Sequence, residues 1–235
     1  MKKRLMMLCL CLVMVMASGM ALGEANIVLE EEAFETFAYS GTAYAYFSAR
    51  VVNQGDVTAR LRDATIEALD KDGNVLSSRP SSRMEPRDLK PGETGYITTE
   101  LTIYDVPKEG PNPIESIRYE LKSAESGYPS VYASLPAEGA FNPPMQDRGN
   151  DVFAVGTVHN DGEETVYAPT MVLILRDQAG QLLLMMDYML YDIGVPPGQK
   201  VSARLRLPEP LIAKWLRAGK FVTTVEAVAH YHMDY

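Results

Sequence analysis

One short pattern of turn residues occurs twice in the chain, and it restricts the fold more than any other feature. It consists of Asn-x-Gly at 53–55, Asp-x-x-Gly at 70–73 and Pro-Gly at 91–92. The first two landmarks recur after 107 residues and the third after 106, which places the second copy at 160–162, 177–180 and 197–198. In each copy these turns separate alternating apolar runs, which predicts two similar β-domains.

Residues 44–52 show the alternation most clearly. Small or apolar side chains occupy one set of positions: Ala45, Phe47, Ala49 and Val51. Polar or tyrosine side chains occupy the other: Tyr44, Tyr46, Ser48 and Arg50. A period of two predicts a strand whose first face is buried and whose second face meets solvent. Residues 152–159 are its counterpart in the second copy.

Similar patterns predict the remaining elements. Further strands are expected at 26–38, 64–69, 75–76, 96–104, 117–121, 131–135, 171–175, 201–207 and 221–231. Residues 77–87 are predicted to be loop or sheet edge, and 141–150 to be loop. A short amphipathic helix is expected at 211–218, because prolines precede it, Gly219 follows it, and Leu211 and Trp215 recur at helical spacing.

About seven short strands per copy, with turns roughly every ten residues, are typical of a β-sandwich. The sequence therefore predicts an all-β fold of two tandem antiparallel immunoglobulin-like β-sandwich domains, at 26–124 and 125–235, with the short helix in the second. The turn pattern resembles the bacterial extracytoplasmic immunoglobulin-like modules of the FxLYD type. The residues that carry this resemblance are Asn53, Gly55, Asp70, Gly73, Pro91 and Gly92, and Asn160, Gly162, Asp177, Gly180, Pro197 and Gly198. The resemblance implies an envelope or extracellular scaffold or binding role, without catalytic residues.

Residues 1–23 have the features of a secretory signal peptide. A basic start is followed by an apolar run at 5–16 and by small residues up to Gly23, and cleavage is expected after Gly23 or Ala25. The alternative is an uncleaved anchor, since 5–22 is marginally long enough to span a membrane. Both cysteines, Cys9 and Cys11, lie in this segment, so the mature chain would have none. Such a chain fits a secreted or envelope-associated bacterial protein.

The charge of the chain bears on its partners. The net charge is −9, and removing 1–23 leaves 19 basic against 31 acidic residues. An acidic surface argues against nucleic acid and against anionic lipid as partners. We therefore expect a protein partner or self-association, and no membrane contact after signal cleavage.

Two clusters could in principle hold a metal ion. Asp70 and Asp72 begin a sequence like that of a calcium loop, but no distal carboxylate completes it, so an ordinary hairpin turn is expected. His230, His232 and Asp234 would share one face of a strand, where incidental solvent-facing side chains are expected. The sequence predicts neither a metal site nor a cofactor.

Catalytic motifs are also missing from the sequence. The mature chain has no cysteine, no G-x-S-x-G and no H-E-x-x-H, so no catalytic residue is assigned. Tyr44 and Tyr46 would project from one sheet face about 7 Å apart, at about 3.4 Å per residue. Their rings could stack on a sugar or another small ligand, although tyrosines on sheets also serve packing.

The largest difference between the copies is the apolar run at 182–191. A strand with one buried face should not need so many apolar residues, so part of the run is expected to be covered. The cover could be copy one, a second protomer or a partner, with an interface at Met185, Met186, Tyr188, Met189 and Tyr191. It could also be the helix at 211–218. Asp187 is expected to guard the strand edge or to pair with Lys214 or Arg217.

These observations favour an exported, non-enzymatic scaffold or protein-interaction module. The alternative is a carbohydrate- or small-ligand-binding module that uses exposed tyrosines on a sheet face.

Overall fold

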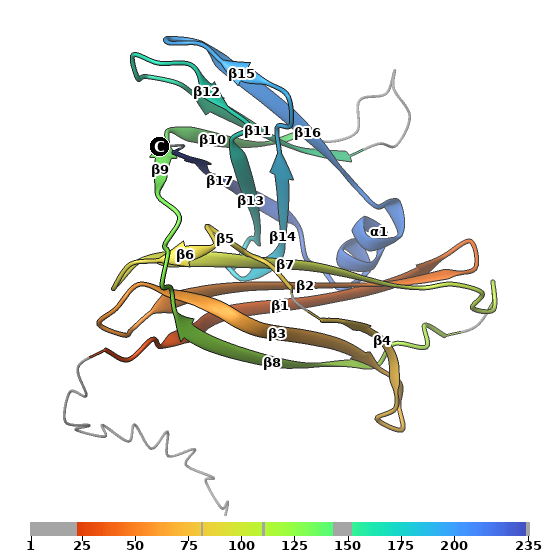
Figure 1. Cartoon of the computed structure of the whole chain (residues 1–235). Coiled ribbons are helices and arrows are strands. Elements are labelled where there is room, and N and C mark those ends of the chain that lie inside the picture. Colours follow the sequence, from red (N-terminus) through yellow and green to blue (C-terminus); the bar gives the residue numbers. More distant parts are fainter. Residues whose placement is uncertain (1–22, 81, 110, 143–151, 234–235) are drawn as a thin grey trace, which may run out of the picture.

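The computed structural model describes residues 23–80, 82–109, 111–142 and 152–233, and shows antiparallel β-sheets with one short helix (Figure 1). The predicted signal segment lies outside the described residues except for Gly23, and Asp234 lies outside them too. All described strand pairs are antiparallel, so the predicted all-β class is confirmed.

The first half of the chain forms two sheets that enclose a core. One sheet, here called the platform sheet, has the order β1 (Ile27–Tyr39), β2 (Thr42–Asn53), β7 (Thr94–Ile103) and β5 (Met84–Glu85). The other contains β3 (Ala59–Leu69), which pairs with β4 (Val75–Arg79) and β6 (Asp88–Leu89) on one side and with β8 (Ser116–Glu125) on the other. Fully buried side chains between the sheets include Phe47, Ile66, Leu89 and Ile97.

The second half also contains two packed antiparallel sheets, to which a small two-stranded ribbon and a helix are added. One sheet, here called the upright sheet, has the order β14 (Leu182–Met189), β13 (Thr170–Asp177), β17 (Val222–His232) and β9 (Tyr132–Leu135). The sheet that packs against it contains β10 (Ala137–Asn142), β11 (Val152–His159) and β16 (Lys200–Leu207). A small ribbon joins β12 (Val166–Tyr167) to β15 (Gly194–Val195), and helix α1 spans Glu209–Arg217, close to its predicted range. The core includes Leu173, Leu175, Leu184 and Trp215.

The two asparagines of the repeated pattern explain why it recurs. Asn53 is fully buried, and its amide group donates to the backbone carbonyls of Val57 and Leu89 at 2.7 and 2.9 Å. Asn160 donates in the same way to Glu164 and Val195, both at 2.7 Å. In each copy the asparagine backbone also bonds to the Pro-Gly turn. The pattern therefore ties two distant turns together in each half, because buried carbonyl groups need partners.

The second element of the pattern is a tight hairpin turn in both halves. The carboxylate of Asp70 accepts hydrogen bonds from the backbone of Asp72 and Asn74, both at 2.8 Å. Asp177 does the same for the backbone of Ala179 and Gln181, at 2.8 and 2.9 Å. The glycines that close the turns, Gly73 and Gly180, have φ of 82° and 76°, a conformation that glycine adopts without strain. The Asp70 carboxylate is thus used by its own turn.

The second half stands on the platform sheet. In Figure 1, β13 and β14 run upright, with their lower ends over β1, β2 and β7. This arrangement corrects one expectation from the sequence. Ala45 and Phe47 face the core of the first half, as predicted, but Ser48 on the opposite face is 1% exposed instead of facing solvent. The second half covers that face.

Candidate functional site

Strand β14 rests on the platform sheet by its free edge. The backbone N–H of Met185 donates to the hydroxyl of Ser48 at 2.8 Å, and this hydroxyl donates to the Met185 carbonyl at 3.4 Å. Met185 is 2% exposed and packs in a small cluster that includes Ala33 and Tyr96 of the first half. The first half therefore supplies the hydrogen-bond partners that an edge strand otherwise lacks at this point.

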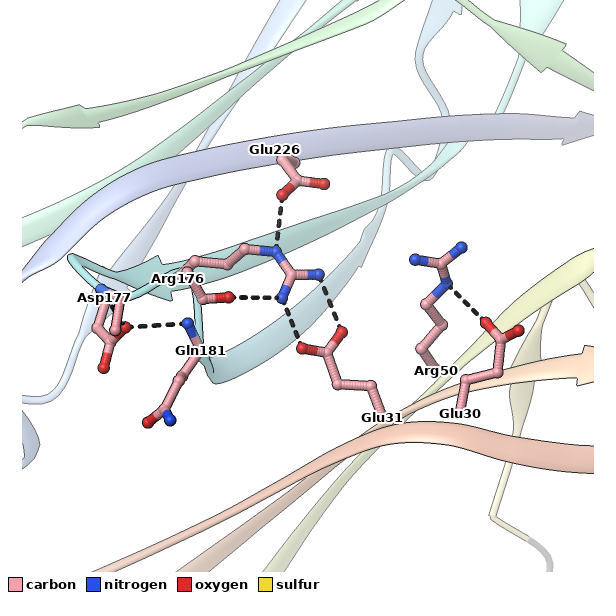
Figure 2. A network of polar contacts seen from close by, with 9 residues as sticks. Glu30, Glu31, Arg50, Arg176, Asp177, Gln181 and Glu226 are labelled. Atoms are coloured by element: carbon pink, nitrogen blue, oxygen red, sulfur yellow. Dashed lines mark hydrogen bonds and ion pairs between the residues drawn. The ribbon is translucent and has the colours of Figure 1, made fainter. Parts of the chain in front are cut away.

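An arginine on β13 joins the halves beside this contact (Figure 2). The guanidinium of Arg176 donates to both carboxylate oxygens of Glu31, at 2.6 and 2.9 Å, and to Glu226 at 2.8 Å. These hydrogen bonds hold the pKa of Glu31 below its usual value, and Glu31 in turn raises the pKa of Arg176. A bidentate pair fixes orientation as well as distance, so it sets how the second half sits on β1.

Two further polar contacts join the halves. The ammonium group of Lys214 on α1 donates to the carboxylate of Glu35 at 2.7 Å and to the Thr36 carbonyl at 3.1 Å. The hydroxyl of Thr98 donates to the carboxylate of Asp187. Asp187 was expected to guard the strand edge or to pair with a base such as Lys214 or Arg217. Pairing with Lys214 is wrong, because the Lys214 ammonium group contacts β1 instead. The error arose because the sequence does not show that β7 passes beneath β14.

The tyrosines considered for ligand stacking belong to the same interface. The ring of Phe37 stacks on Tyr44 and Tyr46, with centroid distances of 4.9 and 6.0 Å. All three rings pack against the core of the second half. Burial, and after it the Glu100 carboxylate, raises the pKa of Tyr46. Packing, the other role considered for these tyrosines, is therefore what the structure shows, and the sheet face that the alternation assigned to solvent is partly covered here by the second half.

Some residues of the apolar run at 182–191 are buried, and others are exposed at the surface. Leu184 and Met186 pack in the main core of the second half, which also contains Trp215 of α1, whereas Met185 packs toward the first half. Tyr188 and Tyr191 remain 43% and 67% exposed, and Met189 is partly buried. Of the covers considered from the sequence, copy one packs on Met185, and the helix shares with Leu184 the core of the second half.

A polar cleft of about 900 Å³ lies where β4, β5 and β7 meet the upper part of β13 and β14. Its hydroxyl groups come from both halves and include Ser78, Thr98, Thr102 and Thr170. Arg79 and Arg83 bring positive charge to it, and Glu85, Glu100 and Asp187 bring negative charge. Met189 and Tyr191 add a thioether and an aromatic ring. This composition suits hydrogen bonding and apolar contact with a partner.

The histidine on β17 lies deeper than the sequence indicates. His230 is 6% exposed, and its Nε2 lies 3.1 Å from a carboxylate oxygen of Glu85 in the first half. The ring of Tyr132 meets it edge-on at a centroid distance of 5.5 Å. The expectation that His230 faces solvent is wrong, because Glu85 of β5 and Tyr132 of β9 lie against it. His232 is exposed, as expected.

A site that holds a metal ion or activates a nucleophile needs particular side chains close together. Within the described ranges, no three His, Cys, Asp or Glu side chains come together as a metal site. The described lining of the cleft includes no histidine or cysteine beside its hydroxyls, so it has no imidazole base to activate a nucleophile. The only helix in the described part of the chain is too short to cross a membrane.

Sequence reasoning missed the cleft because residues from strands far apart in the chain form it. The only signal was the apolar run at 182–191, which ends at the cleft in Met189 and Tyr191. No protein-family model matches the chain, and a search of curated proteins finds no significant match.

Proposed function

We propose that the protein is an exported, non-enzymatic scaffold of the bacterial cell envelope or exterior that binds a protein partner in the cleft between its halves. One observation carries the proposal: a cleft of about 900 Å³ has Tyr191 at its border, 67% exposed, beside Met189. Tyrosine, methionine and arginine are enriched at protein interfaces. Because the halves are joined by packing and by bidentate hydrogen bonds, the cleft keeps its shape before a partner arrives.

The proposal includes two tandem immunoglobulin-like domains, at 26–124 and 125–235. Two sandwich-like halves with equivalent asparagine and aspartate contacts support it, as does the resemblance of the turn pattern to FxLYD-type modules. In each half, the Asp-x-x-Gly turn joins two neighbouring strands of one sheet, β3 to β4 in the first half and β13 to β14 in the second. Export depends on the signal segment, and the intact mass of the released protein should show a chain that starts at Glu24 or Asn26.

A photocrosslinking residue in place of Tyr191 tests the partner directly in producing cells. The same residue in place of Phe221, which is 52% exposed beside α1, is the matched control. We expect a discrete protein adduct from position 191 and none of that mass from position 221. No adduct at 191, or the same adducts at both positions, would contradict a cleft partner.

A carbohydrate or small polar ligand is the second candidate, because hydroxyl and carboxylate groups of the cleft could bind sugar hydroxyls. It would bind in the cleft and not on Tyr44 and Tyr46, which are packed between the halves. A glycan array separates the two candidates: binding that is lost in Tyr191→Ser would favour the sugar.

A further inference from the structure

Three arginines surround a second hollow, of about 500 Å³, on the first half of the molecule. Arg62 comes from β3, and Arg83 and Arg87 flank β5. All three are exposed. Leu61 and Tyr132 give the hollow an apolar side, and Glu85 is its only acidic lining residue among those described.

The carboxylates near these arginines already have other partners. Asp88 is 4% exposed and pairs with Arg60 at 3.1 Å. Glu85 pairs with His230. Acidic groups are thus present, but their contacts lead away from the hollow.

The side chains of these arginines form no ion pair with an acidic side chain of the described residues. Among the residues that the structure describes, no ion pair or side-chain hydrogen bond involves Arg62, Arg83 or Arg87. This is unusual in a chain with a net charge of −9, where acidic side chains outnumber basic ones. Three positive charges gathered around one hollow, where the one acidic lining residue described is Glu85, repel one another, and the repulsion is relieved when an anion binds.

We propose that Arg62, Arg83 and Arg87 form a binding site for a ligand that carries two or more phosphate or carboxylate groups. The planar guanidinium fork binds either group with two hydrogen bonds, so several arginines around one hollow favour a multiply charged ligand. The hollow shares Ser82, Arg83 and Glu85 with the polar cleft described above, so the anion would bind at the edge of that cleft. The site does not depend on a protein partner in the cleft.

Titration calorimetry of the purified chain with inorganic pyrophosphate and with citrate tests the proposal. Acetate serves as the singly charged comparison. We expect pyrophosphate, citrate or both to bind, and the affinity to fall as NaCl rises from about 0.05 to about 0.2 M, because salt screens exposed charges. Binding of one probe alone identifies the group that the site prefers.

Two variants and one control locate the binding. Arg83→Gln, and Arg62→Gln combined with Arg87→Gln, should each weaken binding about tenfold, since each removes charge-assisted hydrogen bonds. Arg118→Gln removes the same charge from β8, where Arg118 pairs with Glu67, and should leave binding unchanged. If neither probe binds better than acetate, or if Arg118→Gln weakens binding as much as Arg83→Gln, the proposal is overturned.

Discussion

The hydroxyl of Ser48 occupies the free edge of β14 at Met185, accepting from its N–H at 2.8 Å and facing its carbonyl at 3.4 Å. The two residues belong to different halves of the chain. An unpaired edge strand invites pairing with other molecules. Here one side chain from the neighbouring half satisfies the edge where it would otherwise be buried without a partner.

Replacing Ser48 with alanine should therefore destabilise the protein. The buried Met185 N–H would lose its acceptor, which costs about 1–2 kcal/mol. Urea unfolding followed by circular dichroism measures this loss. Ser202→Ala is the control, because the hydroxyl of Ser202 bonds to that of Thr157 on an exposed face, and it should change stability by less than about 0.5 kcal/mol. Equal effects would mean that the Ser48 contact contributes nothing specific.

Glutamate in place of Met186 and of Met189 should have different effects. Met186 packs against the core that contains Trp215, so burying a charge there should cost about 3 kcal/mol or more. Met189 lines the open cleft, so its replacement should cost less than about 1 kcal/mol. Urea titration with light scattering follows both. The assignment of Met189 to the cleft would fail if Met189→Glu unfolded the protein as readily as Met186→Glu.

The contact between Arg176 and Glu31 should make stability depend on pH. The pKa of Glu31 in the folded chain lies below 4.5, first because of the hydrogen bonds from Arg176. When a carboxyl group has a lower pKa in the folded chain than in the unfolded chain, its ionised form stabilises the fold at pH values above the unfolded-state pKa. This stabilisation is lost as the pH falls through the folded-state pKa. Wild type should therefore lose more stability than Glu31→Gln between about pH 5 and pH 3.

Glu109→Gln is the control for this pH dependence, since Glu109 lies in an exposed loop. It should follow the wild-type curve. Unfolding free energies across the pH range give the comparison, and parallel curves for wild type and Glu31→Gln would show that the pair does not hold the halves together.

Asn53→Ala and Asn160→Ala should destabilise their respective halves to similar extents. Each substitution leaves one buried and one partly buried carbonyl group without its donor, which should cost about 2–4 kcal/mol. Asn74→Ala is the matched control, because Asn74 is exposed at a turn. Hydrogen exchange should show that amide protection is lost first in the half that carries the substitution. A loss no larger than that of Asn74→Ala would remove the structural reason for the repeat.

The sequence predicted what lies within one strand or one turn and failed where distant segments meet. Ala45 and Phe47 were assigned to the core because period two needs no knowledge of other strands. Ser48 was assigned to solvent because its partner, Met185, is far along the chain. Strand β10 was missed because Gly139 interrupts its pattern. That glycine is needed there, since a Cβ at this position would lie 2.2 Å from the Val225 carbonyl oxygen.

Residues 125–235 expressed alone test how far the halves depend on one another. The sequence predicts that this fragment unfolds cooperatively, and most of the core around Leu173 and Trp215 lies within it. The fragment would lose Phe37 from that core and the cover over Met185. It should therefore be about 2–4 kcal/mol less stable than the second half of the full chain, and it should self-associate through the uncovered edge of β14.

Adding residues 24–124 as a separate chain should restore the stability of the fragment and prevent its self-association. The platform sheet would again supply Ser48 to the Met185 backbone and Glu31 to Arg176. Light scattering should show the self-associated fragment converting to a one-to-one complex, and urea titration should show its stability rising. The matched control adds the same first half with Ser48→Ala and Glu31→Gln, which should restore less stability than the wild-type first half. A fragment that is monomeric and fully stable alone would show that the contact with the first half contributes nothing to the second.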